Sequence, residues 1–293
     1  MRKVLFYITY FVLWVVAWLP LPILYVLSDI TYFIIYHVAQ YRVKTARQNI
    51  HNAFPQKSEK ERRKLEHRFY HHLCDYGFET IRMMHISEKE IQRRITFENT
   101  ELLHKLAQNE QNMIALFGHY CNWEWVCSLP LHLHNTMSVS TLYKTLKDDD
   151  FDRFFIHLRS RFGTYCYPKQ KVLRGIVELK KLNKPFILAF IADQTPSWNN
   201  LHYWTTWLNQ DTPLLTGWET IARKTNNPVL FLEMHKVKRG YYQCRVELLC
   251  AEPQTQEQYT LVEKYARRME QNILDAPEFW LWSHKRWKHQ RQQ

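Results

Sequence analysis

The first forty residues hold the longest apolar stretch of the chain. The segment Val4–Ser28 contains no charged residue, and about 20 apolar residues are enough for a helix to span a bilayer. Pro20 and Pro22 interrupt the segment, and proline kinks a helix because it lacks the N–H donor. The pattern predicts a membrane anchor over residues 1–41, either as one span over Val4–Leu19 or as a kinked hairpin that enters a single leaflet.

Basic residues flank the anchor on both sides. Arg2 and Lys3 precede it, and Arg42, Lys44 and Arg47 follow it. Lysine and arginine beside a membrane segment stay preferentially on the cytoplasmic side. This distribution does not settle the orientation of a single span, and it favours an insertion with both flanks in the cytoplasm.

After residue 41, apolar runs of strand length alternate with amphipathic runs of helical length. Strands are expected at Asn112–Phe117, Met137–Tyr143, Pro185–Ala192, Pro228–Met234 and Tyr241–Leu249. Helices are expected over 44–83, Trp123–His134, Asp148–Phe162, Lys169–Leu182, Leu215–Thr225 and Glu257–Leu274. The alternation predicts an α/β fold with a largely parallel central sheet flanked by helices, in one globular domain of residues 42–293.

The glycine content argues against two common nucleotide-binding motifs. Six glycines occur among 293 residues, whereas average usage of about 7% would give roughly 20. Neither a GxGxxG fingerprint nor a GxxxxGK[ST] loop occurs. We therefore expect no nucleotide cofactor, and no cofactor of another kind is indicated.

The six cysteines do not form a metal-binding pattern. No CxxC pair occurs, and the cysteines are spread along the chain, mostly among apolar neighbours. Reduced cysteines of a protein core have this distribution. We therefore expect no metal site, and a main domain in a reducing compartment.

The charge balance points to an acidic partner. Lysine and arginine number 40 against 28 aspartate and glutamate residues, which gives a formal net charge of +12. Nucleic acid, anionic lipid and an acidic carrier protein all fit such a charge. Charge alone does not choose among them.

The most informative segment is Leu116–Glu124, which follows one expected strand and precedes an expected helix. Residues five apart on a continuous helix lie about 140° apart, so His119 and Glu124 can meet only if His119 lies in the turn. An imidazole beside a carboxylate is suited to deprotonate a hydroxyl, since the carboxylate fixes the tautomer. The alternative is a surface histidine beside an ordinary glutamate of a helix start, with Asn122 as the N-cap.

The segment Gly-His-Tyr-Cys-Asn-Trp-Glu resembles the G-H-x-G-N-W-E block of the lipid A biosynthesis acyltransferases. These lauroyl and myristoyl transferases belong to the lysophospholipid acyltransferase superfamily, which is marked by H-x4-D/E. Cys121 stands where the block has glycine. Further similarity follows in order along nearly the whole chain, at Arg42-x-Lys44-x2-Arg47-x-Asn49, Phe54-Pro55, Arg159-Ser-Arg161, Asp193-Gln194 and Trp282-Ser-His-Lys-Arg-Trp287.

The resemblance implies a set of site residues. His119, Glu124 and Arg159 would be catalytic, with the arginine stabilising the oxyanion or holding an anionic substrate. Arg161 is the alternative for that role, and on the residues alone both arginines fit the C-terminal end of a helix. Substrate-binding roles fall to Asn122, Arg161, Lys144, Asp193, Gln194 and Thr216.

The activity implied by the resemblance is acyl transfer to a hydroxyl. The acyl donor would be acyl carrier protein, and the acceptor an anionic lipid, the lipid A precursor, at the cytoplasmic face of the bacterial inner membrane. A lysophospholipid or an amino-acid-containing lipid is the alternative acceptor. A membrane-tethered basic protein that binds nucleic acid would explain the charge but not the ordered motifs, so no nucleic acid is expected as partner.

Overall fold

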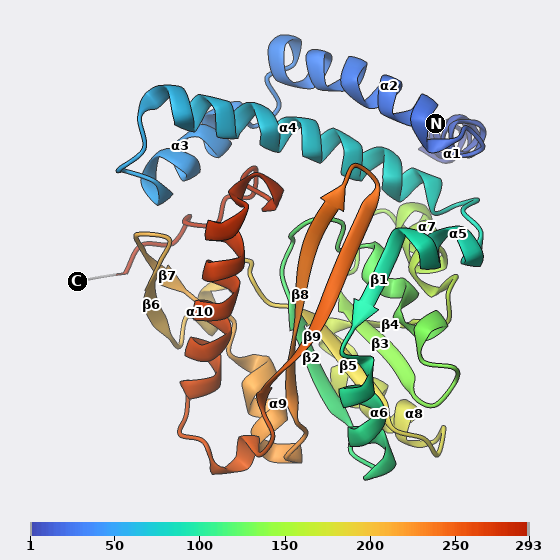
Figure 1. Ribbon diagram of the computed structural model, residues 1–293, viewed down its shortest axis with the longest axis vertical. Coiled ribbons are helices and arrows are strands. Elements are labelled where there is room, and N and C mark those ends of the chain that lie inside the picture. Colours follow the sequence, from blue (N-terminus) through green and yellow to red (C-terminus); the bar gives the residue numbers. More distant parts are fainter. Residues whose placement is uncertain (1, 292–293) are drawn as a thin grey trace.

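A seven-stranded sheet forms the centre of the molecule (Figure 1). In the computed structural model, which describes residues 2–291, the strand order is β1-β9-β8-β2-β5-β3-β4. All neighbouring strands are parallel except the antiparallel pair β8 and β9. The strands are β1 (Ile95–Glu98), β2 (Met113–Phe117), β3 (Ser138–Tyr143), β4 (Tyr165–Pro168), β5 (Phe186–Ile191), β8 (Val229–Lys238) and β9 (Tyr241–Cys250). The expected α/β fold with a largely parallel sheet is confirmed.

Helices cover both faces and one end of the sheet (Figure 1). The N-terminal ones are α1 (Arg2–Ala17), α2 (Leu21–Phe33, continued by a π-helical turn Ile34–Val38), α3 (Val43–Ala53), α4 (Glu59–Arg82) and α5 (Glu88–Arg94). The later ones are α6 (Thr100–Gln108), α7 (Asp149–Ser160), α8 (Val172–Lys180), α9 (Gly217–Thr225) and α10 (Thr260–Asp275). A separate hairpin of β6 (Trp204–Trp207) and β7 (Gln210–Pro213) packs beside α10.

Most expected elements are present, with three kinds of difference. The expected helix 44–83 is two helices, because Phe54-Pro55 ends α3 and a complete capping box of Ser58 and Glu61 starts α4. The expected helix Trp123–His134 is a shorter 3-10 helix, Trp125–His132, which contains Pro130. The short elements β1, β4, β6, β7, α5 and α6 were not predicted.

The core lies around two adjacent central strands. Every residue of β2 is buried, and β5 is buried over its first four residues. The two strands are parallel and in register from Met113 opposite Ile187 to Phe117 opposite Ile191. Because parallel strands end at the same edge of a sheet, residues that follow Phe117 and Ile191 at equal distances are brought side by side.

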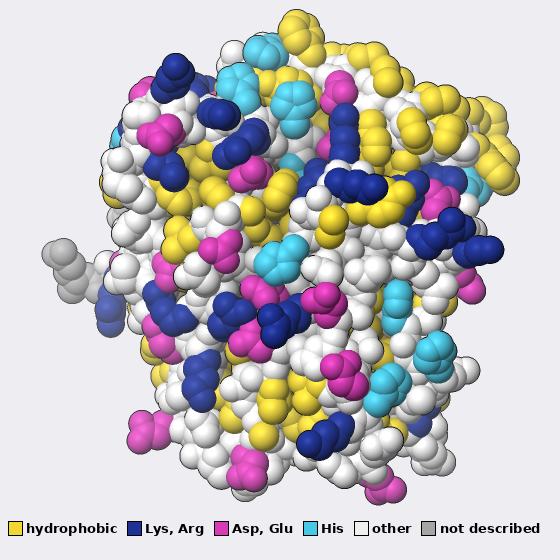
Figure 2. Space-filling view, in the orientation of Figure 1, with side chains coloured by type: hydrophobic (Ala, Val, Ile, Leu, Met, Phe, Trp, Pro, Cys, Tyr) yellow, Lys and Arg dark blue, Asp and Glu magenta, His cyan; other side chains and the backbone are white. Residues whose placement is uncertain are grey.

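The apolar N-terminus forms two helices rather than one. The helix is interrupted at Trp18–Pro20, between α1 and α2. Helix α2 lies along α4 at one end of the molecule (Figure 1). The segment Leu21–Val38 is long and apolar enough to cross a membrane by length and composition. Large apolar side chains are exposed along both helices, among them Val4, Leu5, Ile8, Phe11, Val26, Ile30 and Phe33, and they form the apolar surface at the top of Figure 2.

The buried face of α2 carries hydrogen-bonded polar side chains beside the buried Leu21 and Leu24. Tyr25 donates a hydrogen bond to Glu79 (2.9 Å), and Ser28 donates one to Asp75 (2.7 Å). About two turns further on, in the π-helical turn, Tyr36 donates to Glu66 (2.6 Å). The inward face of this segment therefore combines polar side chains with leucines, whereas most side chains on its outward face are apolar.

Candidate active site

His119 and Asp193 lie together at the carboxyl edge of the sheet. Each follows its strand by two residues, so the register of β2 and β5 places them opposite each other. The Nδ1 atom of His119 lies 2.7 Å from Oδ1 of Asp193, and the backbone N–H of His119 donates to Oδ2 at 2.9 Å. In parallel sheets, ligands bind beyond the carboxyl ends of the strands, which is where this pair is found.

Asp193 is held in its ionised form. Its carboxylate is almost fully buried (1% exposed) and also accepts a hydrogen bond from the indole Nε1 of Trp280 (2.8 Å). Burial raises the pKa of Asp193, but the charge and hydrogen bonds of His119 and the Trp280 donor outweigh it and lower the pKa to about 2. An ionised Asp193 accepts from Nδ1, so this nitrogen carries the proton and Nε2 carries the lone pair.

The free nitrogen of His119 faces an amide. The Nε2 atom of the histidine lies 3.0 Å from Nε2 of Gln194, and an amide N–H in that place donates to the imidazole lone pair. A second imidazole, that of His284, lies nearby, and burial lowers its pKa to about 4, so it is neutral at pH 7. Of these two imidazoles, His119 is therefore the one whose Nε2 is available to accept a proton at this edge of the sheet.

Gly118 permits the close packing behind the pair. A Cβ atom on this residue would lie 3.3 Å from Cγ of Asp193 and 2.5 Å from the terminal methyl of Met269 on α10. The methionine is flexible and could yield, but the carboxylate is fixed by its hydrogen bonds. The absence of a side chain at Gly118 thus permits close approach of the backbone to its neighbours.

Glu124 pairs with Arg159 rather than with His119. The guanidinium of Arg159 donates from Nε (2.7 Å) and Nη2 (2.6 Å) to the two carboxylate oxygens of Glu124. The carboxylate is 2% exposed, and Tyr76 contacts it from α4 at 3.4 Å. Burial lowers the pKa of Arg159, and the ion pair with Glu124 raises it. The ion pair outweighs burial, so the pKa of Arg159 is higher than its ordinary value. The pairing of His119 with Glu124, expected from their spacing, is not the pairing in this structure.

The His119–Asp193 pair and the Glu124–Arg159 pair are nevertheless neighbours in the fold. The indole of Trp123 makes an edge contact with the His119 ring, with the centroids 5.1 Å apart. On its other side Trp123 stacks on Tyr76, with the centroids 3.9 Å apart. Through these two contacts the histidine pair and the Glu124–Arg159 pair share one cluster of side chains.

Three other predicted residues lie outside this cluster. Arg161 turns away from Arg159 and donates to the backbone carbonyl of Met83, at the end of α4. Lys144 follows β3 at the carboxyl edge of the sheet and is exposed to solvent. Thr216 starts α9, and within residues 2–291 no hydrogen bond links it to His119 or Asp193.

Asn122 is fully buried with both ends of its amide engaged. Its Oδ1 accepts from the backbone N–H of Trp125 (3.2 Å). The residue is not the N-cap expected from the sequence, because the helix starts at Trp125 and its N-cap is Glu124. Its Nδ2 donates to Glu79 on α4 (2.7 Å), and Tyr242 on β9 donates to the same carboxylate oxygen (2.8 Å). Asn122 thus connects the turn that carries His119 to α4 and to the sheet.

Cys121 adopts the backbone conformation that favours glycine. Its φ is +52°, in the left-handed region that costs a residue with a side chain roughly 1 kcal/mol or more. The turn is held there by a hydrogen bond from its N–H to the carbonyl of Phe279 (2.9 Å). This geometry explains why glycine suits the corresponding position of the G-H-x-G-N-W-E block.

The segment after α10 completes the site and was only partly predicted. Besides the indole of Trp280, the N–H of Leu281 donates to the carbonyl of His119 (3.1 Å). Neither spacing nor composition marks Trp280 for this role, because its partner lies far away in the sequence. The nearest signal in the sequence was the similarity to the acyltransferase family that begins two residues later, at Trp282.

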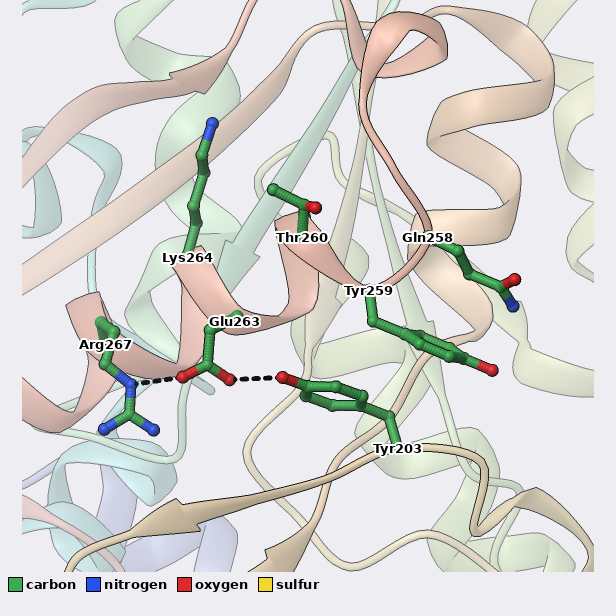
Figure 3. A pocket seen from close by; sticks show the side chains of 7 residues that line it. All are labelled: Tyr203, Gln258, Tyr259, Thr260, Glu263, Lys264 and Arg267. Atoms are coloured by element: carbon green, nitrogen blue, oxygen red, sulfur yellow. Dashed lines mark hydrogen bonds and ion pairs between the residues drawn. The ribbon is translucent and has the colours of Figure 1, made fainter.

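A hollow of about 430 Å³ lies elsewhere, beside the N-terminal half of α10. Figure 3 shows its lining, in which Glu263 binds both Tyr203 (2.8 Å) and Arg267 (2.9 Å). None of the side chains that line it contacts His119 or Asp193 by a hydrogen bond. Within residues 2–291 no group of three or more His, Cys, Asp or Glu side chains is placed to hold a metal ion.

This α/β protein places an ionised carboxylate and an imidazole together at the carboxyl edge of its parallel strands. Such an arrangement is typical of enzymes in which a general base deprotonates a bound substrate. The family model described as bacterial lipid A biosynthesis acyltransferase matches residues 1–289. The chain therefore belongs to the bacterial lipid A biosynthesis acyltransferase family and is an acyltransferase that acts in lipid A synthesis. No curated protein matches the chain at a significant level.

Proposed function

We propose that the protein transfers a fatty acyl group from an acyl thioester to a hydroxyl of a lipid A precursor, with His119 as the general base. The observation that carries this proposal is the hydrogen bond between His119 Nδ1 and Asp193. It leaves Nε2 as the acceptor for a hydroxyl proton, in the arrangement by which a carboxylate orients a catalytic histidine. We assign the orienting role to Asp193 in place of Glu124.

In this mechanism the acceptor hydroxyl occupies the place of the Gln194 amide beside His119. Nε2 takes the hydroxyl proton, and the oxygen attacks the carbonyl carbon of the thioester. The carbon–sulfur bond of the tetrahedral intermediate then breaks, and the departing thiolate takes the proton back from the imidazolium. The products are an ester and a thiol, and Asp193 stabilises the imidazolium throughout.

Arg159 is the proposed donor to the oxyanion. Glu124 engages Nε and Nη2, so the remaining nitrogen Nη1 can turn to the substrate. A guanidinium held by a bidentate carboxylate keeps its orientation, which is what stabilisation of a developing charge requires. Glu124 is then a positioning residue, and Arg161, which binds the Met83 carbonyl, is left without a catalytic role.

We propose that the acyl donor is acyl carrier protein, an acidic protein that suits the net charge of +12. Asn122 and Thr216, predicted as substrate-binding, have protein-facing positions that support structural roles. Lys144 and Gln194 retain the proposed substrate contacts, because both are accessible at the carboxyl edge of the sheet.

The membrane attachment we propose is in-plane, at the cytoplasmic face of the bacterial inner membrane. The polar contacts of Tyr25, Ser28 and Tyr36 run along the segment Leu21–Val38. Arg239 also forms an ion pair with Asp29 of α2 (2.6 Å). A spanning helix would have to break these contacts in hydrocarbon, at several kcal/mol for each exposed polar group. These contacts count against a span by α2. The single-span alternative over Val4–Leu19 lies in α1, whose Phe6 ring packs against Phe151 of α7, and we therefore favour the hairpin alternative.

The proposed assignment is tested by acyl transfer to a purified lipid A precursor in four variants. His119→Ala and Asp193→Ala should lower kcat by about 10²–10⁴-fold, the range for loss of a general base or its orienter. Glu124→Gln should lower kcat because Arg159 loses its bidentate partner, and Arg161→Gln should stay near wild type. Full activity in Asp193→Ala together with loss in Glu124→Gln would restore the His119–Glu124 pairing. Circular dichroism checks that each variant is folded.

The donor is identified in the same assay. Matched thioesters of acyl carrier protein and coenzyme A, with one acyl chain, are compared at equal concentration. We expect transfer from the carrier protein thioester at a kcat/KM that falls as salt is added, because attraction between opposite charges is screened. Equal use of the coenzyme A thioester would overturn the carrier protein assignment while leaving the base in place.

A further inference from the structure

Arg286 is a fully buried cation in the segment that follows α10, and it has no exposed surface (0%). Its Nη2 donates to the backbone carbonyl of Pro213, at the end of β7 (2.7 Å). Its Nε and Nη1 atoms are buried and have no hydrogen-bond partner within residues 2–291. Arginine is almost never fully buried without an ionic partner, because removing the charge from water is costly. The position of this charge therefore needs a cause other than an ion pair in direct contact.

Two indoles connect Arg286 with Asp193. The guanidinium carbon lies over the ring of Trp207, 5.3 Å from its centroid. Trp207 meets the indole of Trp280 at 90°, with the centroids 5.4 Å apart, and Trp280 donates to the Asp193 carboxylate (2.8 Å). The backbone makes a second connection, since the hydroxyl of Thr195 donates to the carbonyl of Arg286. These contacts fix the Arg286 segment beside the loop that carries Asp193.

Asp193 is the ionised group whose charge acts on Arg286. Burial lowers the pKa of Arg286 to about 10, and Asp193 and Tyr265 oppose this change. Because burial raises the pKa of the Tyr265 hydroxyl well above its ordinary value, this hydroxyl is neutral at pH 7. Arg286 therefore stays protonated at neutral pH, and its counter-charge is Asp193.

The other titratable groups around the base carry no net charge at pH 7. They are one imidazole, one phenol and one ion pair, namely His284, Tyr76 and Glu124–Arg159. Burial lowers the pKa of the imidazole and raises that of the phenol, so both are neutral. The electrostatic balance at His119 is therefore set by Asp193 and Arg286.

This balance bears on the protonation of the base. An ionised Asp193 alone favours the imidazolium form of His119, and an imidazolium cannot accept the proton of a hydroxyl. A buried cation opposes protonation, because water does not screen it. We propose that Arg286 is a positioning residue for acyl transfer, which acts through Asp193 to keep His119 neutral at physiological pH. This inference rests on the proposed role of His119 as the base.

The test compares three variants of the full chain in detergent micelles. Arg286→Gln removes the charge and keeps an N–H donor for the carbonyl of Pro213. Arg286→Lys keeps the charge. The matched control is Lys285→Gln, which removes the exposed charge of the adjacent residue.

The first measurement is the dependence of kcat/KM on pH. We expect the acid limb of the profile to move up by about one pH unit in Arg286→Gln, the effect of removing one nearby charge. The rate should then fall about fivefold at pH 6 and stay within about twofold of wild type at pH 8.5. Arg286→Lys and Lys285→Gln should keep the wild-type profile. An equal loss at both pH values in Arg286→Gln overturns the proposal, because a structural defect has that effect.

The second measurement follows the protonation of His119 without turnover. Diethyl pyrocarbonate acylates neutral imidazole, and peptide mass spectrometry locates the label. Labelling of His119 at pH 6 should fall about fivefold in Arg286→Gln, while labelling of the exposed His134 serves as the internal reference. Unchanged labelling of His119 in this variant overturns the proposal.

These outcomes separate the role of Arg286 from the assignment of the base. Full activity in His119→Ala refutes the base itself. Loss of activity in His119→Ala with an unmoved profile in Arg286→Gln refutes only the role of Arg286. If Arg286→Gln does not fold, Arg286→Lys decides, since a retained charge must give wild-type activity and labelling, and a loss at all pH values overturns the proposal.

Discussion

Asp193 is the residue on which the proposed base depends. It is buried, ionised and surrounded by three donors from two segments, namely the backbone N–H and Nδ1 of His119 in the turn after β2 and the indole of Trp280. Such a carboxylate has a lower pKa in the folded than in the unfolded chain, so it stabilises the fold at any pH at which it is ionised. The same contacts therefore serve both orientation of the histidine and stability.

The pH dependence of stability should show this contribution. With a pKa of about 2 in the folded protein against about 3.9 in the unfolded chain, Asp193 contributes roughly 2 kcal/mol above pH 5. This contribution is lost as the pH falls from about 4 to 2. Asp193→Asn should therefore unfold more easily than wild type at pH 5, with a difference that vanishes near pH 2. Chemical denaturation at a series of pH values measures it.

The control for this measurement is Asp211→Asn, which changes an exposed aspartate. It should match wild type across the same pH range. A constant difference between Asp193→Asn and wild type from pH 5 to pH 2 would show that the ionised carboxylate is not what stabilises the fold.

At the scale of elements, α4 joins the apolar N-terminal helices to the turn that carries His119. Glu79 accepts from Tyr25 of α2, from Asn122 of the turn and from Tyr242 of β9. Burial raises the pKa of Glu79, partly offset by Lys236 and these donors. The Glu79 carboxylate therefore fixes the position of the turn that carries His119 through its hydrogen bonds to α2, the turn and β9.

Asn122→Asp tests this junction. The substitution replaces the N–H₂ donor by an oxygen and places two carboxylates at hydrogen-bond distance in a buried site, which raises their pKa values. We expect a loss of roughly 2–4 kcal/mol in the free energy of unfolding at pH 7. The loss should shrink as the pH falls towards 5, since one shared proton relieves the repulsion. Thermal unfolding at both pH values measures the change.

Asn183→Asp is the matched control, because Asn183 is exposed. It should leave stability within about 0.5 kcal/mol of wild type at both pH values. A loss in Asn122→Asp that does not depend on pH would show that repulsion between the introduced carboxylate and Glu79 is not its cause.

The long elements were predictable from the sequence and the contacts between them were not. Continuous apolar runs identified β2 and β5, and the carboxyl-edge position of Asp193 followed from the strand that precedes it. Local spacing suggested Glu124 as the partner of His119, but strand register brought Asp193 there and left Glu124 to Arg159. Register between strands depends on packing across the whole sheet, and a single sequence does not encode it in any local pattern.

At the scale of the whole molecule, the exposed large apolar side chains are concentrated on the N-terminal helices at one end of the protein. The exposed apolar side chains of α1 and α2 gather at the top of Figure 2, while α8 and α9 lie at the far end in Figure 1. Exposed apolar patches of this kind mark surfaces that contact a partner or a membrane. Because Tyr25, Ser28 and Tyr36 bind α4, the outward face of this segment is the one that we propose contacts lipid.

Vesicle binding should depend on the outward face of α2. Ile30 and Phe33 are 54% and 58% exposed there, and insertion of each into the interface is worth about 1.5–3 kcal/mol. Ile30→Asp and Phe33→Asp should each lower partitioning onto phosphatidylethanolamine–phosphatidylglycerol vesicles by at least about tenfold. The control is Leu173→Asp on α8, at the far end of the molecule, where the side chain is 71% exposed. Vesicle co-sedimentation measures the binding. Unchanged binding in Ile30→Asp and Phe33→Asp would contradict in-plane docking through this face, and so would an equal loss of binding in Leu173→Asp.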